Sequence, residues 1–332
     1  MSLAEKFQIL SLSGGGARGL YTARVLEELE LRFNTSISKH FDMVCGTSIG
    51  GILALGLAAD IPAKIIRQSF QDNLPTIFPP PGRFATVKQA LTAKFSPAPL
   101  KAVLLEIFED RRIGDLKNCV LVPSINYSVG RVRAFKTPHN TMFYQDAQHT
   151  LVDVALATSA APTYFPLHEI DNARYVDGGL VANNPILMGV IEAYRALEVP
   201  LERLSGLSIG NMGQGLAIDH NKSNDLGYRG WGMGQDIIAL AMSAGEKLYS
   251  DMARMLLQGR LEIIDSEATK EQAHLLSLDN GSAAATEILL AHASSEAGTR
   301  VNDERVKEFF QHTSRTAPIA QDHQESSDDA KV

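Results

Sequence analysis

The chain has 332 residues, of which 45% are hydrophobic and 21% are charged, and its formal net charge is −7. These values are typical of a globular protein with a sizeable core. The negative charge argues against a nucleic-acid polymer as partner and against docking on anionic lipid by charge alone, because both need a basic surface.

Short apolar runs alternate with amphipathic stretches along the chain. The run 7–12 ends at a group of glycines and predicts a buried strand, and the amphipathic stretch 20–33 predicts a helix. Further strands are expected at 41–45, 120–124, 132–136, 174–176, 204–209 and 261–264. Further helices are expected at 48–59, from 60–62 onward, and at 99–109, 151–157, 185–197, 233–257, 283–294 and 303–312. This alternation predicts an α/β fold, a three-layer sandwich with a mostly parallel central sheet.

Three segments are expected to lie outside regular structure. Residues 73–83 contain three consecutive prolines, and residues 212–234 are long, glycine-rich and polar, which is typical of a lid or a binding loop. The polar stretch 313–332 is almost without aliphatic residues and is expected to be a disordered tail. We therefore expect one domain over residues 7–312.

Both cysteines, Cys45 and Cys119, lie in apolar runs, so we expect buried free thiols, as in proteins of a reducing compartment. The first residues contain no charged segment followed by a long apolar segment, so no signal peptide is expected. No apolar run is long enough to span a bilayer. These features predict a cytoplasmic location.

Ser48 lies in Gly46-Thr47-Ser48-Ile49-Gly50, between a predicted strand and an apolar helix. This pattern is typical of a nucleophile elbow, in which a tight turn holds the serine and glycines flank it because side chains there would clash. The helix that follows places its positive end at the serine, which favours a developing oxyanion. The pattern is short, and the alternative is a helix-capping serine with tightly packed glycines.

A glycine run, Gly14-Gly15-Gly16-Ala17-Arg18-Gly19, follows the first strand, and its amides could form an oxyanion hole. The same glycines fit the GxGxxG pattern of a dinucleotide-binding loop. That alternative needs an acidic residue at the end of the second strand to bind ribose, whereas Asp42 lies at its start. The serine motif at the end of this strand favours the oxyanion loop over a dinucleotide site and over a simple turn.

Arg18 lies at the N-terminus of a predicted helix, where the helix dipole disfavours a cation. An acidic partner, a carbonyl or a substrate phosphate must compensate. Two interpretations stay open: Arg18 braces the loop through backbone carbonyls, or it contacts the substrate.

Asp177 is the candidate base for Ser48. It ends a predicted strand, and Gly178 and Gly179 turn the chain after it. In a dry cleft its pKa would be raised, and the carboxylate could accept the serine proton directly. The alternative is an ordinary Asp-Gly turn, which we would favour if the other motifs were missing. The histidines that follow have no distinctive setting; they are His220, His274, His292, His312 and His323.

Four stretches in this order resemble the patatin-like phospholipase family; they are SGGGARG at 13–19, GTSIGG at 46–51, ATSAAPTYFP at 157–166 and VDGGLVANNP at 176–185. The resemblance spans residues 7–210. It implies a Ser–Asp dyad without a catalytic histidine, at Ser48 and Asp177. It also implies an oxyanion hole from the amides of Gly14, Gly15 and Gly16, with Arg18 as the arginine of that loop.

Members of this family hydrolyse acyl esters of phospholipids and galactolipids. The resemblance therefore implies a serine acyl hydrolase that acts on phospholipid at a membrane surface, with no metal and no cofactor. A narrower resemblance, to compact bacterial members of the CapV type, implies an anti-phage effector switched on by a cyclic nucleotide, and it leaves a homo-oligomer open. The alternatives are a constitutive housekeeping lipase or esterase and, less favoured, a dinucleotide-binding oxidoreductase.

Lipid must be reached without a membrane span, so an active enzyme is expected to be peripheral to the inner membrane. Four apolar residues around the three prolines could form an interfacial edge; they are Leu74, Ile77, Phe78 and Phe84. The alternative, slightly favoured, is that they cover the core.

Overall fold

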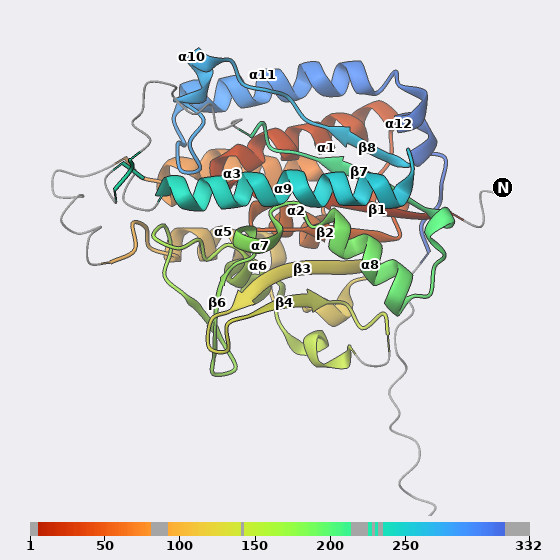
Figure 1. Ribbon diagram of the computed structural model, residues 1–332, viewed down its shortest axis with the longest axis horizontal. Coiled ribbons are helices and arrows are strands. Elements are labelled where there is room, and N and C mark those ends of the chain that lie inside the picture. Colours follow the sequence, from red (N-terminus) through yellow and green to blue (C-terminus); the bar gives the residue numbers. More distant parts are fainter. Residues whose placement is uncertain are drawn as a thin grey trace, which may run out of the picture.

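The computed structural model describes residues 6–80, 92–140, 143–213, 225–227, 230–231 and 235–315. In these ranges an eight-stranded sheet lies at the centre, with helices around it (Figure 1). The strands are β1 (Phe7–Leu12), β2 (Met43–Gly46), β3 (Cys119–Asn126), β4 (Arg131–Lys136), β5 (His168–Ile170), β6 (Ala173–Asp177), β7 (Leu204–Ile209) and β8 (Leu261–Ile264). The helices are α1 (Gly19–Phe33), α2 (Ile49–Ala58), α3 (Ala63–Ile77), α5 (Ala98–Phe108), α6 (Leu151–Thr158), α7 (Gly179–Ala182), α8 (Ile186–Ala196), α9 (Gln235–Leu257), α10 (Lys270–Ala273), α11 (Ala283–Arg300) and α12 (Glu304–Phe309).

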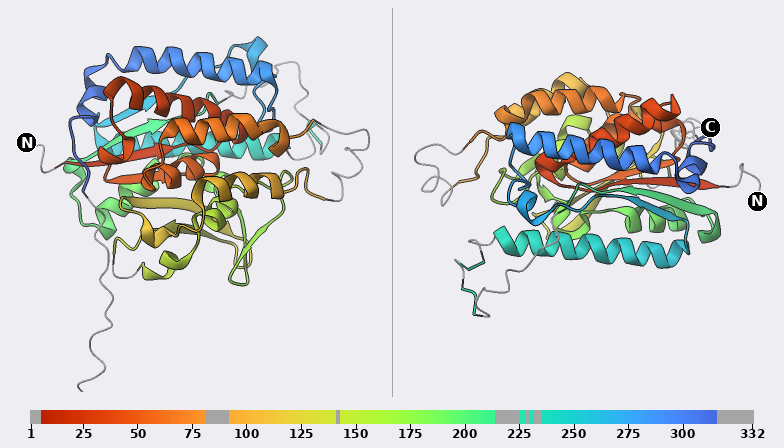
Figure 2. Two further views of the ribbon diagram at one scale, coloured as in Figure 1. Left: turned by 180° about the vertical axis from the view of Figure 1, so that it is seen from behind. Right: turned by 90° about the horizontal axis from the view of Figure 1, so that it is seen from above.

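The sheet is mostly parallel and is covered on both faces. Strands β8, β7, β1, β2 and β3 pair in this order and run parallel, whereas β4, β5 and β6 pair antiparallel. Helices α8 and α9 cover one face, and α1, α3 and α11 lie on the other (Figure 2). The expected three-layer α/β sandwich is confirmed.

Two apolar cores lie on opposite faces of the sheet. Leu10 and Val44 pack into the larger core with α1 and α2, whereas their neighbours Ile9 and Cys45 pack into the smaller core under α8 and α9. Successive residues of a strand point to opposite faces. The central strands are therefore buried on both faces, which is why they appear in the sequence as mostly apolar runs.

Strand β3 brings two distant segments together. β4 pairs with residues 121–126 along one edge of β3; on the other edge, β2 pairs with residues 119–121 and β6 with residues 124–126. Because β2 runs parallel to β3 and β6 antiparallel, their carboxyl ends point toward each other along this edge. The serine elbow follows one of these ends, and Asp177 is the other.

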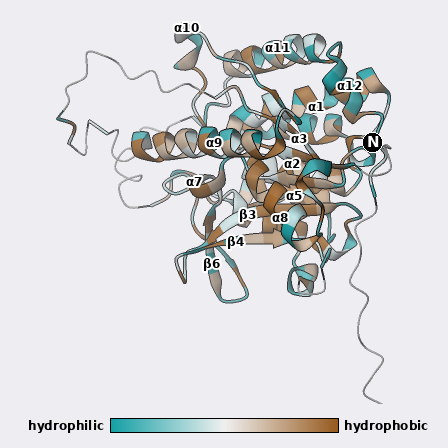
Figure 3. Ribbon diagram, turned by 45° about the vertical axis from the view of Figure 1, so that its right-hand side comes forward, coloured by the Kyte–Doolittle hydropathy of each residue, from teal (hydrophilic) through white to brown (hydrophobic). Residues whose placement is uncertain are grey.

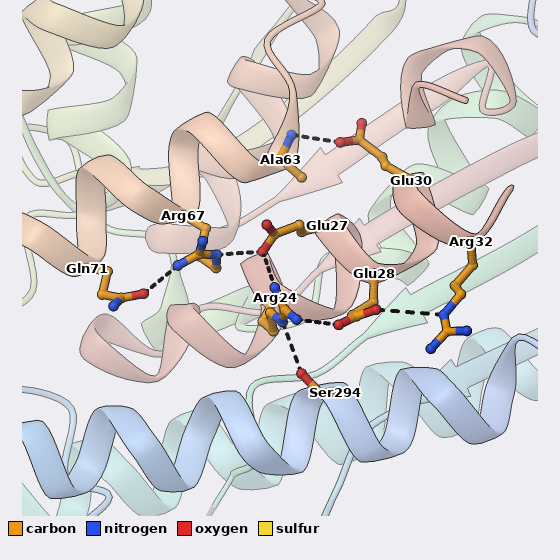
Figure 4. A network of polar contacts seen from close by, with 9 residues as sticks. All are labelled: Arg24, Glu27, Glu28, Glu30, Arg32, Ala63, Arg67, Gln71 and Ser294. Atoms are coloured by element: carbon orange, nitrogen blue, oxygen red, sulfur yellow. Dashed lines mark hydrogen bonds and ion pairs between the residues drawn. The ribbon is translucent and has the colours of Figure 1, made fainter. Parts of the chain in front are cut away.

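A polar network joins α1, α3 and α11 behind the larger core (Figure 4). Glu27 of α1 accepts hydrogen bonds from Arg24 at 2.8 Å and from Arg67 of α3 at 2.5 Å. Arg24 also donates to Ser294 of α11 at 3.0 Å. Burial raises the pKa of Glu27, but the bonds from Arg67 and Arg24 outweigh it and hold the pKa below its usual value.

Two helices are longer than expected. α3 continues through Pro75 to Ile77, so the expectation of irregular structure is wrong for residues 73–77. Leu74 and Ile77 are buried in the core, and this packing outweighs the N–H that proline lacks. α11 also extends to Arg300, six residues beyond its expected end at 294.

The apolar residues near the prolines do not form an exposed edge. Leu74 and Ile77 are each 1% exposed and belong to the core. Phe78 packs against Phe95 and Phe165, with ring centroids 5.3 and 6.0 Å away. The core interpretation therefore holds for these three residues, and Phe84 lies outside the described residues.

The first residues of the expected tail are hydrogen-bonded. The N–H of Ser314 donates to the carbonyl of Lys39 at 2.8 Å, and the N–H of Arg315 donates to the carboxylate of Asp42 at 2.8 Å. The ring of His312 also contacts Asp42, at 2.7 Å. Residues 312–315 are thus held by the segment 38–42, which is far away in sequence and supplies the acceptors. Residues 316–332 lie outside the described ranges.

Cys45 and Cys119 are free and buried, as expected. Burial raises the pKa of both thiols, that of Cys119 to about 12, so neither is a reactive thiolate at neutral pH. Among the described helices, none has both the length and the hydrophobicity needed to cross a bilayer.

Candidate active site

Ser48 occupies a strained turn between β2 and α2. Its φ of 55° and ψ of −126° lie in a region that a residue with a side chain rarely adopts. A side chain at Gly46 would overlap the carbonyl of Gly50, and one at Gly50 would overlap the carbonyl of Leu12. The Ser48 side chain makes no capping bond to α2, so the helix-capping alternative does not account for it.

Two threonines hold this turn. Thr158, the last residue of α6, accepts the N–H of Ser48 at 3.0 Å and donates its hydroxyl to the carbonyl of Pro123 at 2.6 Å. Thr47 donates its hydroxyl to the carbonyl of Ala182 at 2.6 Å. The elbow is thereby attached to β3, α6 and α7, which stabilises a backbone conformation that is unfavourable by itself.

Asp177, the last residue of β6, is 3% exposed. Its carboxylate accepts the N–H of Gly179 at 2.7 Å, and the hydroxyl of Ser48 lies beside it. Burial raises the pKa of Asp177 to about 6, although the contacts with Gly179 and Ser48 act in the opposite direction. Such a carboxylate is ionised at neutral pH and is basic enough to accept a proton from a neighbouring hydroxyl.

One apolar pocket contains the candidate residues from three separate motifs. Ser48, Asp177, Gly15 and Gly16 all line it. The other lining residues are Ile49, Ile52, Phe70, Ile77, Phe78, Leu100, Ser159, Ala161, Pro162, Tyr164, Phe165, Leu180, Ile238, Met242 and Leu278. The free space in this cavity is ≈ 50 Å³. The walls can solvate an acyl chain, whereas the polar groups are gathered at the serine.

Two of the three candidate glycines of the loop line the pocket. They are Gly15 and Gly16. The N–H of Gly14 donates to the carbonyl of Asn183 at 2.9 Å, so this amide is already engaged. Gly16 has a φ of +56°, and a side chain there would overlap the carbonyl of Leu278. The amides of Gly15 and Gly16 therefore remain the candidates for the oxyanion hole.

The buried guanidinium of Arg18 lies within electrostatic range of two carboxylates. Burial lowers its pKa, and the charges of Glu246 and Asp265 act against this effect. Its Nε atom is buried and has no hydrogen-bond partner among the described residues. The pKa of Asp265 is itself raised to about 7 by burial. The positive charge of Arg18 is thus offset by the negative charges of Glu246 in α9 and of Asp265, which follows β8.

The elements of the alternative sites are not found together. Asp42 accepts the N–H of Gln8 at 2.7 Å in addition to its bonds with the end of the chain, and it lies at the opposite end of β2 from Ser48. It therefore does not supply the ribose ligand of a dinucleotide site. No histidine of the described ranges lines the pocket. Within the same ranges, no three His, Cys, Asp or Glu side chains are arranged to hold a metal ion.

Four residues of the site were not identified from the sequence. Thr158 and Asn183 lie inside the stretches that resemble the family, but nothing in their local pattern indicates a role. Asn211 follows β7, and its side-chain amide donates to the carbonyl of Gly14. Glu246 lies in the middle of α9, where a lone glutamate is usually a solvated residue. Their contacts span up to 233 residues of sequence, so only the folded chain reveals them.

Comparisons with known proteins agree with this geometry. The family model described as patatin-like phospholipase matches residues 10–190. The chain is 43% identical over 319 residues to a protein of Pseudomonas aeruginosa named cGAMP-activated phospholipase, with 94% of each chain covered. Proteins of the same name are 34% identical over 330 residues in Escherichia coli, covering 92% of this chain and 93% of that one, and 37% identical over 314 residues in Vibrio cholerae, covering 85% and 87%. The chain belongs to the patatin-like phospholipase family.

Proposed function

We propose that this protein is a phospholipid acyl hydrolase in which Ser48 is the nucleophile and Asp177 the general base. The observation that carries the proposal is that Ser48 and the Asp177 carboxylate, both buried, lie beside each other in one apolar pocket. The hydrolase unit spans residues 7–312. A serine and a carboxylate suffice for both halves of the reaction when the carboxylate has a raised pKa and water is scarce.

In the first half of the reaction, Asp177 accepts the hydroxyl proton as the oxygen of Ser48 forms a bond to the ester carbonyl carbon. The negative charge that develops on the carbonyl oxygen is stabilised by the N–H groups of Gly15 and Gly16 and by the N-terminus of α2. The bond to the leaving alcohol then breaks, and protonated Asp177 returns the proton to that oxygen. The alcohol leaves, and Ser48 carries the acyl group.

In the second half, water attacks the acyl carbon while Asp177 accepts a proton from it. The bond between the carbon and the oxygen of Ser48 breaks, and the proton returns to Ser48. A fatty acid leaves and the starting state is restored. Every proton in this cycle moves through the Asp177 carboxylate, so the scheme needs no histidine.

We further propose that a cyclic dinucleotide activates the enzyme in anti-phage defence. The similar proteins are named for activation by cGAMP, and they align with this chain over almost its whole length. A second support is the size of the pocket, which leaves only ≈ 50 Å³ of free space. A ligand that favours a more open state of the pocket would give an acyl chain easier entry.

The proposed place of action is the cytoplasmic side of the inner membrane, where the enzyme binds peripherally. Helix α9 supports this proposal because it carries apolar side chains both toward the pocket and toward solvent. Ile238 and Met242 line the pocket, whereas an outward stripe is exposed to solvent; it consists of Ile237, Leu240, Leu248, Met252 and Met255. Hydrophobic residues recur along this helix between hydrophilic ones (Figure 3). An acyl chain could thus pass from bilayer to pocket along apolar surface.

Fatty acid release from phospholipid vesicles tests the proposal. We expect the wild-type protein to release fatty acid in the presence of cGAMP and the Ser48→Ala variant to release none. Equal rates with and without cGAMP would identify a constitutive lipase. Release by Ser48→Ala at the wild-type rate would remove Ser48 as the nucleophile.

A further inference from the structure

We propose that Glu246 of α9 is a positioning residue that sets the direction of the Gly15 amide. It acts through Asn183, which holds the neighbouring residue Gly14. The inference rests on the proposed acyl hydrolase reaction, because it assigns the Gly15 N–H to the oxyanion. It concerns a residue outside the matched family segment, residues 10–190.

Asn183 holds Gly14 at two points. Its main-chain carbonyl accepts the N–H of Gly14 at 2.9 Å, and its side-chain Nδ2 donates to the carbonyl of Gly14 at 3.1 Å. The side-chain amide of Asn211 donates to the same carbonyl. Both ends of Gly14 are therefore fixed, and its carbonyl carries two donors.

The direction of the Gly14 carbonyl determines that of the next amide. A trans peptide unit is planar, and its C=O and N–H groups point in opposite directions. With the Gly14 carbonyl turned toward Asn183 and Asn211, the N–H of Gly15 points away from them. Gly15 lines the pocket together with Ser48. Any loosening of the asparagine contacts thus changes the aim of this amide.

Glu246 determines which way the Asn183 amide faces. One carboxylate oxygen of Glu246 accepts Nδ2 of Asn183 at 2.7 Å, and the other accepts the hydroxyl of Ser13 at 2.6 Å. The Oδ1 atom of Asn183 has no hydrogen-bond partner within the described part of the chain. A carboxylate is only an acceptor, so it rejects the flipped amide, in which Oδ1 would face both Glu246 and the Gly14 carbonyl.

One face of α9 both lines the pocket and contacts Asn183. Ile238, Met242 and Glu246 are spaced by four residues, so they lie on one face of the helix. The first two form a wall of the pocket, and the third holds the residue that aims the amide. A charge-assisted bond is suited to this role because it is stronger than a bond between neutral groups.

The Glu246→Gln substitution tests the proposal with almost no change in shape. A glutamine can donate to Oδ1 of the flipped Asn183, so it no longer selects the orientation that holds Gly14. We expect kcat for a soluble chromogenic ester, measured with saturating cGAMP, to fall roughly 10-fold to 100-fold, because a misplaced donor costs up to about 100-fold. KM should change little, since the ground-state ester does not carry the oxyanion charge. The Asp251→Asn variant, which changes an exposed carboxylate on the same helix, should match wild type.

A double-mutant cycle tests whether Glu246 acts through Asn183. If it does, the variant with both Asn183→Ala and Glu246→Gln should be no slower than Asn183→Ala alone. Multiplied losses in the double variant, or a wild-type kcat in Glu246→Gln, would overturn the proposal. Titration of active Ser48 with a fluorophosphonate corrects each rate for unfolded protein.

Hydrogen–deuterium exchange of peptides that cover residues 13–19 gives a readout independent of turnover. We expect faster exchange in Glu246→Gln than in wild type and no change in Asp251→Asn. If neither the wild-type protein nor Ser48→Ala hydrolyses the ester, the proposed reaction fails, and this exchange still decides whether Glu246 orders the loop. Unchanged exchange in Glu246→Gln would contradict the positioning role.

Discussion

Ser48 and Asp177 lie beside each other in one pocket, and both residues are almost completely buried. They come together because β2 and β6 meet end to end along one edge of β3. The proximity of the two side chains is therefore a consequence of the sheet topology.

Replacement of the proposed base should remove turnover without unfolding the protein. Asp177→Asn keeps the size of the side chain but cannot accept the serine proton, so we expect kcat for a chromogenic ester to fall by about 10³-fold or more. The melting temperature should not fall, because the substitution removes a buried charge. Near-normal activity in this variant would exclude Asp177 as the base.

The activity should depend on pH through the same carboxylate. Asp177 acts as a base only when it is ionised, and burial raises its pKa to about 6. We expect kcat/KM to rise with pH and to level off above this value, with a single ionisation in the acid limb. Stopped assays in buffers of constant ionic strength measure the profile. An acid limb near pH 4 would mean that the catalytic carboxylate is not buried.

Gly16 of the glycine loop and Gly130, between β3 and β4, offer a matched pair of substitutions. Gly16 and Gly130 both have a positive φ, but a side chain at Gly16 would overlap the Leu278 carbonyl, whereas nothing lies within 4 Å of one at Gly130. We expect Gly130→Ala to cost about 1 kcal/mol of unfolding free energy from backbone strain alone. Gly16→Ala should cost clearly more and should also reduce turnover. Urea unfolding and ester hydrolysis measure the two effects, and equal costs would contradict the close packing at Gly16.

The outward stripe of α9 should bind lipid. Leu248 is 56% exposed on α9, and Leu31 is 61% exposed on α1, so they form a matched pair. We expect Leu248→Asp to weaken binding to phospholipid vesicles in a flotation assay, because a carboxylate at the headgroup boundary is costly, and Leu31→Asp to leave it unchanged. Loss of self-association in Leu248→Asp, with vesicle binding intact, would instead identify the stripe as an interface between copies.

The polar network that joins α1, α3 and α11 should contribute to the stability of the protein at neutral pH. Glu27→Gln removes a charged acceptor shared by Arg24 and Arg67, and we expect a loss of about 2 kcal/mol of unfolding free energy. The folded state holds the pKa of Glu27 below its usual value, so its contribution is present above the unfolded pKa and is lost as pH falls through the folded one. Urea unfolding at pH 7 and pH 3 should show the difference between variant and wild type shrinking with acid.

Much of the fold could be predicted from local pattern. The central strands are buried on both faces, so they appear as apolar runs, and the helices of the outer layers show the expected periodicity. The local sequence pattern did not predict the ends of elements that are set by packing against residues far away in sequence. The three consecutive prolines suggested irregular structure from residue 73 onward, but core contacts of Leu74 and Ile77 extend α3 to residue 77. The short β5 carries too few residues to produce a pattern.

The sequence by itself determined the candidate catalytic residues, because a tight elbow and a glycine loop impose local steric demands that few residue types satisfy. Gly46, Ser48 and the glycine run can be identified from the sequence for this reason. Only the tertiary structure decided which groups meet. In the folded chain the Gly14 amide donates to Asn183, and Asp42 is hydrogen-bonded to His312 and Arg315. Glu246 contacts Asn183, which holds the glycine loop. Hydrogen bonds between side chains far apart in sequence leave no local trace, since either partner alone resembles an ordinary polar residue.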